Sequence, residues 1–167
     1  MIIMGVDPGL KVTGYGVISF QDNTLRGLHY GGIRTDPDLP MQRRLKGIYD
    51  ALSDLIREYR PDALVVEELF FNRNVNTAFA VGMARGVTLL AAEMEGVPVS
   101  SYTPLQVKRA VVGYGRATKG QIQQMVKVLL GLGEVPTPDD AADALALAIC
   151  HANSYRLSQM ITSDPLP

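Results

Sequence analysis

The chain has 167 residues, of which 47% are apolar and 20% charged, with a formal net charge of −1. This length and composition exclude disordered and fibrous proteins and predict one globular domain. The lone cysteine, Cys150, excludes an internal disulfide, and an apolar N-terminus interrupted at Asp7 does not match a secretory signal. Every apolar run is too short for a membrane span, so we expect a cytoplasmic protein without a membrane partner.

The first third of the chain is predicted to form three strands and one helix. Ile2 to Val6 is a short apolar run, residues 13 to 20 partly alternate in polarity, and a third strand is expected from Leu25 to Arg34. These segments predict an antiparallel meander. Apolar residues then recur at helical spacing from Met41 to Tyr59, which predicts an amphipathic helix.

Strands and helices alternate in the rest of the chain. Ala63 to Val66 is a continuous apolar run typical of a strand buried on both faces, and a short edge strand is expected at 97–99. Helices are predicted over 77–95, 104–112, 119–130 and 138–155. This order predicts an α/β fold with a mixed five-stranded sheet flanked by helices. We expect a folded domain over residues 1–157 and a flexible C-terminal tail over 158–167.

Charge is distributed unevenly along the chain. Residues 69–133 contain seven basic residues and two acids, whereas the remainder contains nine basic residues and fifteen acids. Within that region, residues 101–133 contain five basic residues and no acid. Such a stretch can attract a polyanion such as nucleic acid. Solvated helix faces would give the same pattern, and charge alone favours that simpler explanation.

Three carboxylates stand where local structure only partly explains them. Asp7 ends the first strand in an Asp-Pro-Gly turn, and Glu67 ends the buried run, where a chain leaving a sheet usually becomes polar. The last helix is expected to begin with Thr137 as N-cap, so its dipole accounts for Asp140 in the first turn. Asp143 lies one turn later, before an apolar run, where an unpaired buried carboxylate would be costly.

These carboxylates are expected to meet at one edge of the sheet. Asp7 and Glu67 lie at strand carboxyl ends, where open α/β sheets bind ligands if the strands are parallel neighbours. Asp140 and Asp143 share one face of the last helix at i, i+3 spacing. Four carboxylates at one point need cations, and hard oxygen ligands suit Mg²⁺ or Mn²⁺. Two such ions about 4 Å apart could support phosphodiester hydrolysis, and the basic stretch would then bind the nucleic acid.

At these residues the sequence resembles the RuvC family of Holliday junction resolvases, which have the RNase H-like (retroviral integrase) fold. The similarity spans nearly the whole chain and is carried by Gly5-Val6-Asp7-Pro8-Gly9 with Thr13-Gly14-Tyr15-Gly16-Val17, Val66-Glu67 with Phe70, Gln106-Val107-Lys108, and Asp140-Ala141-Ala142-Asp143-Ala144-Leu145-Ala146. The resemblance implies a homodimeric, divalent-metal-dependent endonuclease. It would cut two symmetry-related strands of a four-way DNA junction and cooperate with the branch-migration proteins RuvA and RuvB.

The resemblance also implies roles for single residues. The catalytic, metal-binding acids of the family match Asp7, Glu67, Asp140 and Asp143. A base-stacking aromatic matches Phe70, and basic residues near the DNA match Lys108 and Lys119. Arg73, beside the aromatic, and Arg116, in the basic stretch, are further DNA-binding candidates. Glu68 is left as a supporting or solvated residue.

Several other residues have ordinary structural explanations. Of Phe70 and Phe71, we expect one to stack on DNA and the other to fill the core. Cys150, which is followed by His151, is expected to be a small core residue, because no histidine–aspartate arrangement of the kind that activates a nucleophile surrounds it in the sequence. A stripe of small residues in the helix 77–95 indicates either tight internal packing or a dimer seam, and it consists of Ala78, Gly82 and Gly86.

Two other functions compete with a metal nuclease. A phosphotransferase of the actin and sugar-kinase superfamily also carries Asp-x-Gly in its first hairpin, but that class surrounds its cleft with two such domains, and this chain holds one. A catalytically silent junction-binding module would be expected to lose carboxylates that only a metal requires. All four are present in this sequence.

Overall fold

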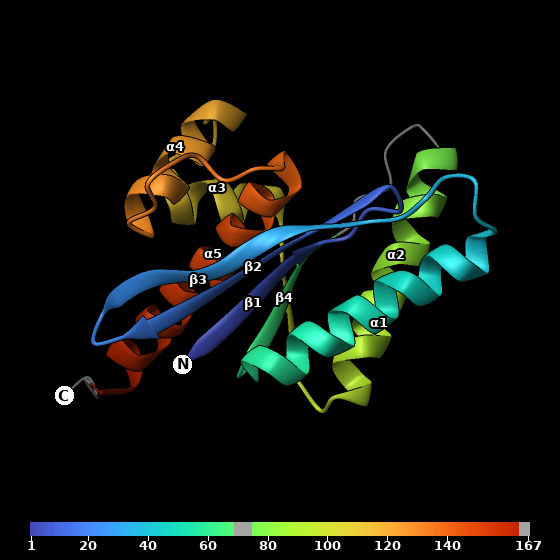
Figure 1. Ribbon diagram of the computed structural model, residues 1–167. Helices are drawn as coiled ribbons and strands as arrows, with labels where there is room; N and C mark the ends of the chain where they lie inside the picture. Colours follow the sequence, from blue (N-terminus) through green and yellow to red (C-terminus); the bar gives the residue numbers. More distant parts are fainter. Residues whose placement is uncertain (69–74, 164–167) are drawn as a thin grey trace.

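Five strands form one mixed sheet with helices on both faces (Figure 1). A computed structural model describes residues 1–68 and 75–163. The strand order is β3-β2-β1-β4-β5. In chain order the elements are β1 (Ile2–Asp7), β2 (Val12–Gln21), β3 (Thr24–Arg34), α1 (Met41–Tyr59), β4 (Ala63–Glu67), α2 (Val75–Met94), β5 (Val99–Tyr102), α3 (Pro104–Val112), α4 (Lys119–Leu129) and α5 (Asp139–Ser163).

The strand directions confirm the predicted mixed sheet. β1, β2 and β3 form an antiparallel meander, whereas β4 runs parallel to both β1 and β5. Val6 of β1 pairs with Val66 of β4, so these parallel neighbours end side by side. The residues that follow this pair, Asp7 and Glu67, therefore lie at the same edge of the sheet.

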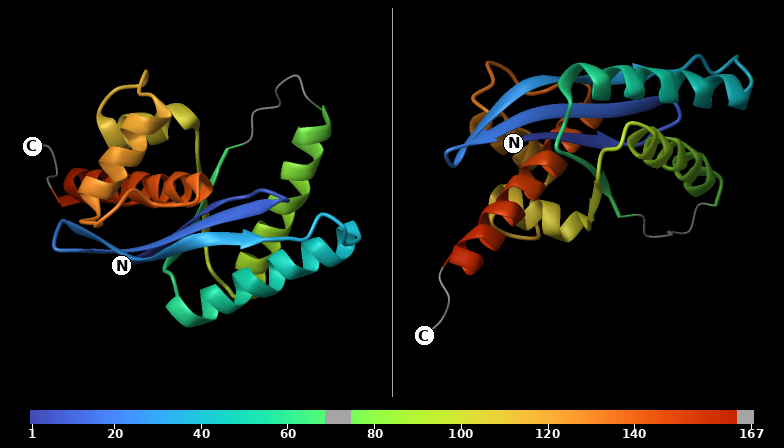
Figure 2. Two further views of the ribbon diagram at one scale, coloured as in Figure 1. Left: turned by 45° about the horizontal axis from the view of Figure 1, so that its top comes forward. Right: turned by 90° about the horizontal axis from the view of Figure 1, so that it is seen from below.

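Each face of the sheet carries its own apolar core. Helices α1 and α2 cover one face, and α5, with α3 and α4 beside it, covers the other (Figure 2). Side chains of β1 alternate between these cores, with Ile3 toward α5 and Met4 toward α1 and α2. In β4, Val65 and Leu64 divide in the same way. Burial on both faces explains why β4 is a continuous apolar run.

Glycines in β1 and β2 allow α5 to lie directly on the sheet. A Cβ at Gly5 would collide with the carbonyl oxygen of Ala144, and one at Gly14 would collide with the backbone of Asp140. Only a residue without a side chain permits this approach. The close packing brings the first turns of α5 to the edge where β1 ends.

Most predicted elements are confirmed, and the differences lie at the edge strand and at the last helix. The edge strand spans 99–102 rather than 97–99. Its pairing with β4 begins where Val99 lies opposite Leu64, and the Leu64 N–H donates to the carbonyl of Pro98 just before this strand. α5 begins at Asp139, one residue later than predicted, so Pro138 rather than Thr137 directly precedes the helix. The helix continues to residue 163, past the expected domain boundary at 157. Among the described residues, no helix has the length and apolar character needed to cross a membrane.

Candidate active site

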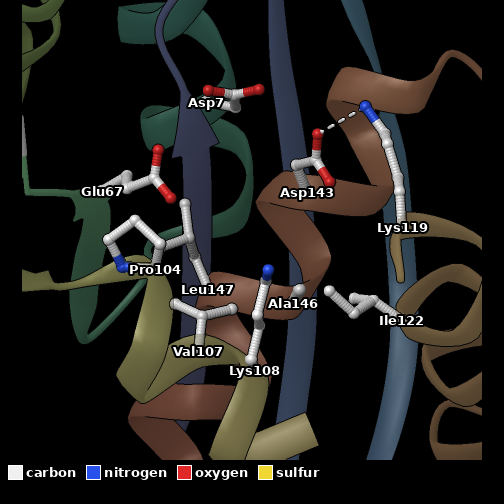
Figure 3. Close-up of a pocket in the computed structure, with 10 residues that line it drawn as sticks. All are labelled: Asp7, Glu67, Pro104, Val107, Lys108, Lys119, Ile122, Asp143, Ala146 and Leu147. Atoms are coloured by element: carbon white, nitrogen blue, oxygen red, sulfur yellow. Dashed lines mark ion pairs between the residues drawn. The ribbon is translucent and has the colours of Figure 1, made fainter. Parts of the chain in front are cut away.

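The ends of β1 and β4 and the start of α5 border one pocket. Its volume is about 220 Å³, and Asp7, Glu67 and Asp143 line it (Figure 3). Each carboxylate comes from a different element, and the last two lie 76 positions apart along the chain, at 67 and 143. The parallel pairing of β1 with β4 and the close packing of α5 are what bring these side chains together.

Two lysines face the same pocket from the helical layer. Lys108 of α3 and Lys119 of α4 both line it (Figure 3). The Lys119 Nζ lies 3.1 Å from Oδ2 of Asp143 and 3.4 Å from Oδ2 of Asp139. A lysine at the first residue of a helix is disfavoured by the helix dipole, and these two carboxylates offset that penalty. The remaining lining is apolar and formed by Pro104, Val107, Ile122, Ala146 and Leu147.

Burial and mutual repulsion raise the pKa values of three carboxylates at the pocket. Burial, followed by the charges of Asp143, Asp140 and Glu67, raises the pKa of Asp7 from 3.8 to about 7, and Lys119 opposes this shift. Burial also raises the pKa of Glu67, reinforced by Asp143 and opposed by Lys108. The pKa of Asp143 is raised by burial, against the stabilising hydrogen bond from Lys119. A proton or another cation bound at Asp7 would therefore relieve this repulsion.

Asp140 lies beside the pocket and does not line it. It is half-buried in the first turn of α5, and its charge contributes to the raised pKa values of Asp7 and Asp143. Glu68 is exposed, and its backbone N–H donates to the carbonyl of Tyr102 at 2.8 Å. The structure thus gathers three of the four predicted acids around the pocket and places the fourth next to them.

The donor set fits a divalent metal ion by its chemistry. Within residues 1–68 and 75–163, no three Asp, Glu, His or Cys side chains lie close enough together to hold one metal ion. The carboxylate oxygens are nevertheless the ligands that Mg²⁺ and Mn²⁺ prefer, and a cation among them would relieve the repulsion that raises the pKa of Asp7.

The other predicted DNA-binding residues differ in where they fall. Arg116 is exposed in the turn between α3 and α4. Phe70 and Arg73 lie outside the described residues. Of the residues with ordinary explanations, Cys150 is buried with 1% of its surface exposed, and burial raises the pKa of its thiol to about 11. This confirms a core role for Cys150.

Three features of the site were not predicted. Arg85 of α2 donates from Nε to the Glu67 carbonyl at 3.4 Å and from a terminal nitrogen to Ser101 Oγ at 3.3 Å, which ties α2 to the ends of β4 and β5. Thr103 and Thr118 begin α3 and α4 with capping boxes. The Thr-x-x-Gln spacing before both helices is a sequence signal for the caps, whereas Arg85 appears in the sequence only as a charge within an apolar segment.

The chain matches known proteins over nearly its whole length. The family model for crossover junction endodeoxyribonuclease RuvC matches residues 3–151. The chain belongs to the RuvC family. The RuvC of Desulforamulus reducens is 60% identical over 152 residues, covering 91% of this chain and 93% of the relative. The Thermus thermophilus RuvC structure is 40% identical with a TM-score of 0.88, covering 95% of this chain and 97% of that one.

A second solved structure shows T. thermophilus RuvC in complex with Holliday junction substrate. It is 38% identical to this chain with a TM-score of 0.86, and covers 94% of this chain and 96% of that one. Membership confirms the predicted RNase H-like fold and the predicted activity: this RuvC-family chain is an endonuclease that resolves four-way DNA junctions in recombination and repair. The reaction of the family depends on metal ions. The phosphotransferase and silent-module alternatives are therefore set aside.

Proposed function

We propose that the pocket lined by Asp7, Glu67 and Asp143 is the hydrolytic site of this nuclease, with Asp140 as a fourth acid. The observation that carries the proposal is the convergence of three carboxylates from three elements on one pocket, with a raised pKa at each. These four acids would hold two Mg²⁺ or Mn²⁺ ions. When bound, such ions supply an acidified water and stabilise charge on the leaving oxygen.

The chain's own side chains would bind and orient the DNA. Lys108 and Lys119 carry ammonium groups on two sides of the pocket, where they can neutralise phosphates flanking the scissile bond. Arg116 lies exposed just before α4 and would contact the backbone further away. Phe70 and Arg73 follow the strand that carries Glu67, and we propose stacking on a junction base for the first and a phosphate contact for the second. Residues 1–157 would form the nuclease domain.

A second copy of the chain would supply the second cut. Paired cleavage of symmetry-related strands requires two sites, and one chain contributes one such set of acids. Helix α2 exposes an apolar face on which Phe79 is 68%, Leu90 53% and Met94 66% exposed. Among the described residues, nothing lies within 4 Å of a Cβ added at Gly82 or Gly86, which leaves room beside these two glycines for a second helix. We propose that two α2 helices pack across this face in a homodimer.

The resemblance to the family supports two further proposals. We propose that RuvA and RuvB are partners of this chain and that it acts in the cytoplasm, where its junction substrate forms. Both statements rest on the family resemblance rather than on a surface of this chain.

Metal-dependent cleavage of a four-way junction, compared with a duplex of the same sequence, tests the proposed site. We expect the parent to cut the junction with Mg²⁺ or Mn²⁺ and not with a chelator present. Asp143→Asn should bind the junction and fail to cut it, because binding comes mainly from lysine and arginine. Asp54→Asn, which makes the same charge change at an exposed position of α1, is the control and should cut normally. Parental turnover by folded Asp143→Asn would contradict the assignment.

A further inference from the structure

A second, larger pocket lies across α3 from the proposed hydrolytic site. Its volume is about 480 Å³, and it opens between α3 and the C-terminal part of α5. The two pockets use opposite faces of α3, because residues 104, 107 and 108 line the first and residues 106, 109 and 110 line the second. At about 100° per residue, these two sets point in opposite directions from the helix axis. Helix α3 therefore forms a wall shared by both pockets.

The second pocket carries positive charge without a matching acid. Arg109 of α3 and Arg156 of α5 both line it, and both are exposed. Neither guanidinium forms an ion pair or a side-chain hydrogen bond with any residue that the structure describes. No Asp or Glu is among the lining residues. Two guanidinium groups at one concave surface repel each other, and an anion bound between them would relieve this repulsion.

The walls of this pocket are held in place by hydrogen bonds. Asn153 of α5 donates from Nδ2 to the carbonyl of Ala110 at 3.0 Å, which joins α5 to α3. At the end of β5, the Tyr102 hydroxyl and His151 Nδ1 are hydrogen-bonded at 3.0 Å. These contacts fix the parts of α3 and α5 from which the two arginines project, so the pocket walls are in place before any ligand arrives.

We propose that this pocket is a second phosphate site, which holds the backbone of a junction arm away from the scissile phosphate. This inference rests on the proposed function. It requires that Lys108, on the opposite face of α3, contacts the same junction DNA near the scissile phosphate. Phosphate esters are favoured over an acidic peptide because the stretch 101–133 carries five basic residues and no acid, which suits a long polyanion that passes over α3. Arginine also binds phosphate oxygens in a bidentate manner.

Junction binding as a function of salt tests this site. Binding is measured without divalent ions for the parent, Arg109→Gln, Arg156→Gln and the double variant, on junctions with long arms and with arms shortened stepwise. Each phosphate contact contributes about 0.9 to the slope of log K against log salt. We expect each single variant to lower the slope by about that amount, the double variant by about twice as much, and the differences to vanish once the arms are too short to reach the pocket.

Controls separate this proposal from the proposed function. Arg26→Gln removes an exposed arginine from β3, at the opposite edge of the sheet from β5, and should leave the slope unchanged. Unchanged melting temperatures verify folding. If the double variant keeps the parental slope on long arms, the second phosphate site is overturned. Binding of oligoglutamate is measured for the same two proteins. If the double variant keeps the parental slope but binds oligoglutamate more weakly than the parent, the pocket is a peptide site instead. Cleavage of the short-armed junction with Mg²⁺ reports on the hydrolytic site separately, and its absence in the parent would refute the proposed function alone.

Discussion

Replacing Asp7 by Asn should stabilise the metal-free protein while it abolishes cleavage. The pKa of Asp7 is raised from 3.8 to about 7 by burial and by neighbouring carboxylates, so its ionisation opposes folding. A rise in pKa of this size corresponds to about 4 kcal/mol at high pH. Protonation of the neighbouring acids relieves part of the same repulsion, so we expect about 2–4 kcal/mol. For a chain of this size that is a rise in Tm of roughly 4–16 °C.

The pH dependence gives the sign of this effect. Because the folded-state pKa of Asp7 is raised, the stability linked to its protonation is fully present below pH 3.8 and is lost as the pH rises through about 7. Thermal unfolding with a chelator should therefore show a large difference between Asp7→Asn and the parent at pH 8, and a much smaller one at pH 5. Adding Mg²⁺ should raise the Tm of the parent and have little effect on the variant.

The matched control is Asp54→Asn, which removes one charge at an exposed position of α1 and should leave the pH dependence of Tm unchanged. Cleavage of a four-way junction is measured on the same samples. If folded Asp7→Asn unfolds at or below the parental temperature at pH 8, with no change between pH 8 and pH 5, the raised pKa of Asp7 is refuted.

Three further predictions concern the DNA contacts and the packing of α5. Lys108→Ala and Lys119→Ala should each flatten the slope of log K against log salt for junction binding by roughly one unit, and unchanged slopes would place both lysines away from the DNA. Phe70→Ala should lose roughly 1–3 kcal/mol of stacking, seen as slower single-turnover cleavage with little change in Tm, whereas Phe71→Ala should lower Tm as a core residue does. The reverse pattern would exchange their roles. Gly5→Ala should cost at least about 1–3 kcal/mol in unfolding free energy and slow cleavage, because its Cβ would push against the backbone of α5. Parental stability and activity would contradict this close packing.

Elements with strong local signals were predicted well. α1 and α3 span the predicted residues 41–59 and 104–112. Their amphipathic spacing and the residues that end them lie within or next to each helix, so the local sequence contains both signals. The edge strand was misplaced because Ser100 and Ser101 have no apolar alternation, and pairing with β4 alone selects them. The start of α5 was misplaced because Thr137 and Pro138 also suit the first positions of a helix.

The sequence by itself determined which residues could carry the chemistry. Acidic residues at strand ends and at the head of the last helix, together with a long basic stretch, are local features of the chain, and they were sufficient to suggest a metal-dependent nuclease of nucleic acid. These features depend only on residue type and short-range spacing, so a single sequence contains them.

Only the tertiary structure decided how those residues meet. The pairing of Lys119 with Asp143, the contact of Arg85 with the Glu67 carbonyl, and the arginine-lined pocket across α3 each join segments far apart in the chain. Such contacts depend on strand order and on how closely α5 approaches the sheet, which glycine permits through the absence of a side chain. The raised pKa of Asp7 has the same origin, because burial and the proximity of other charges arise only when distant segments pack together.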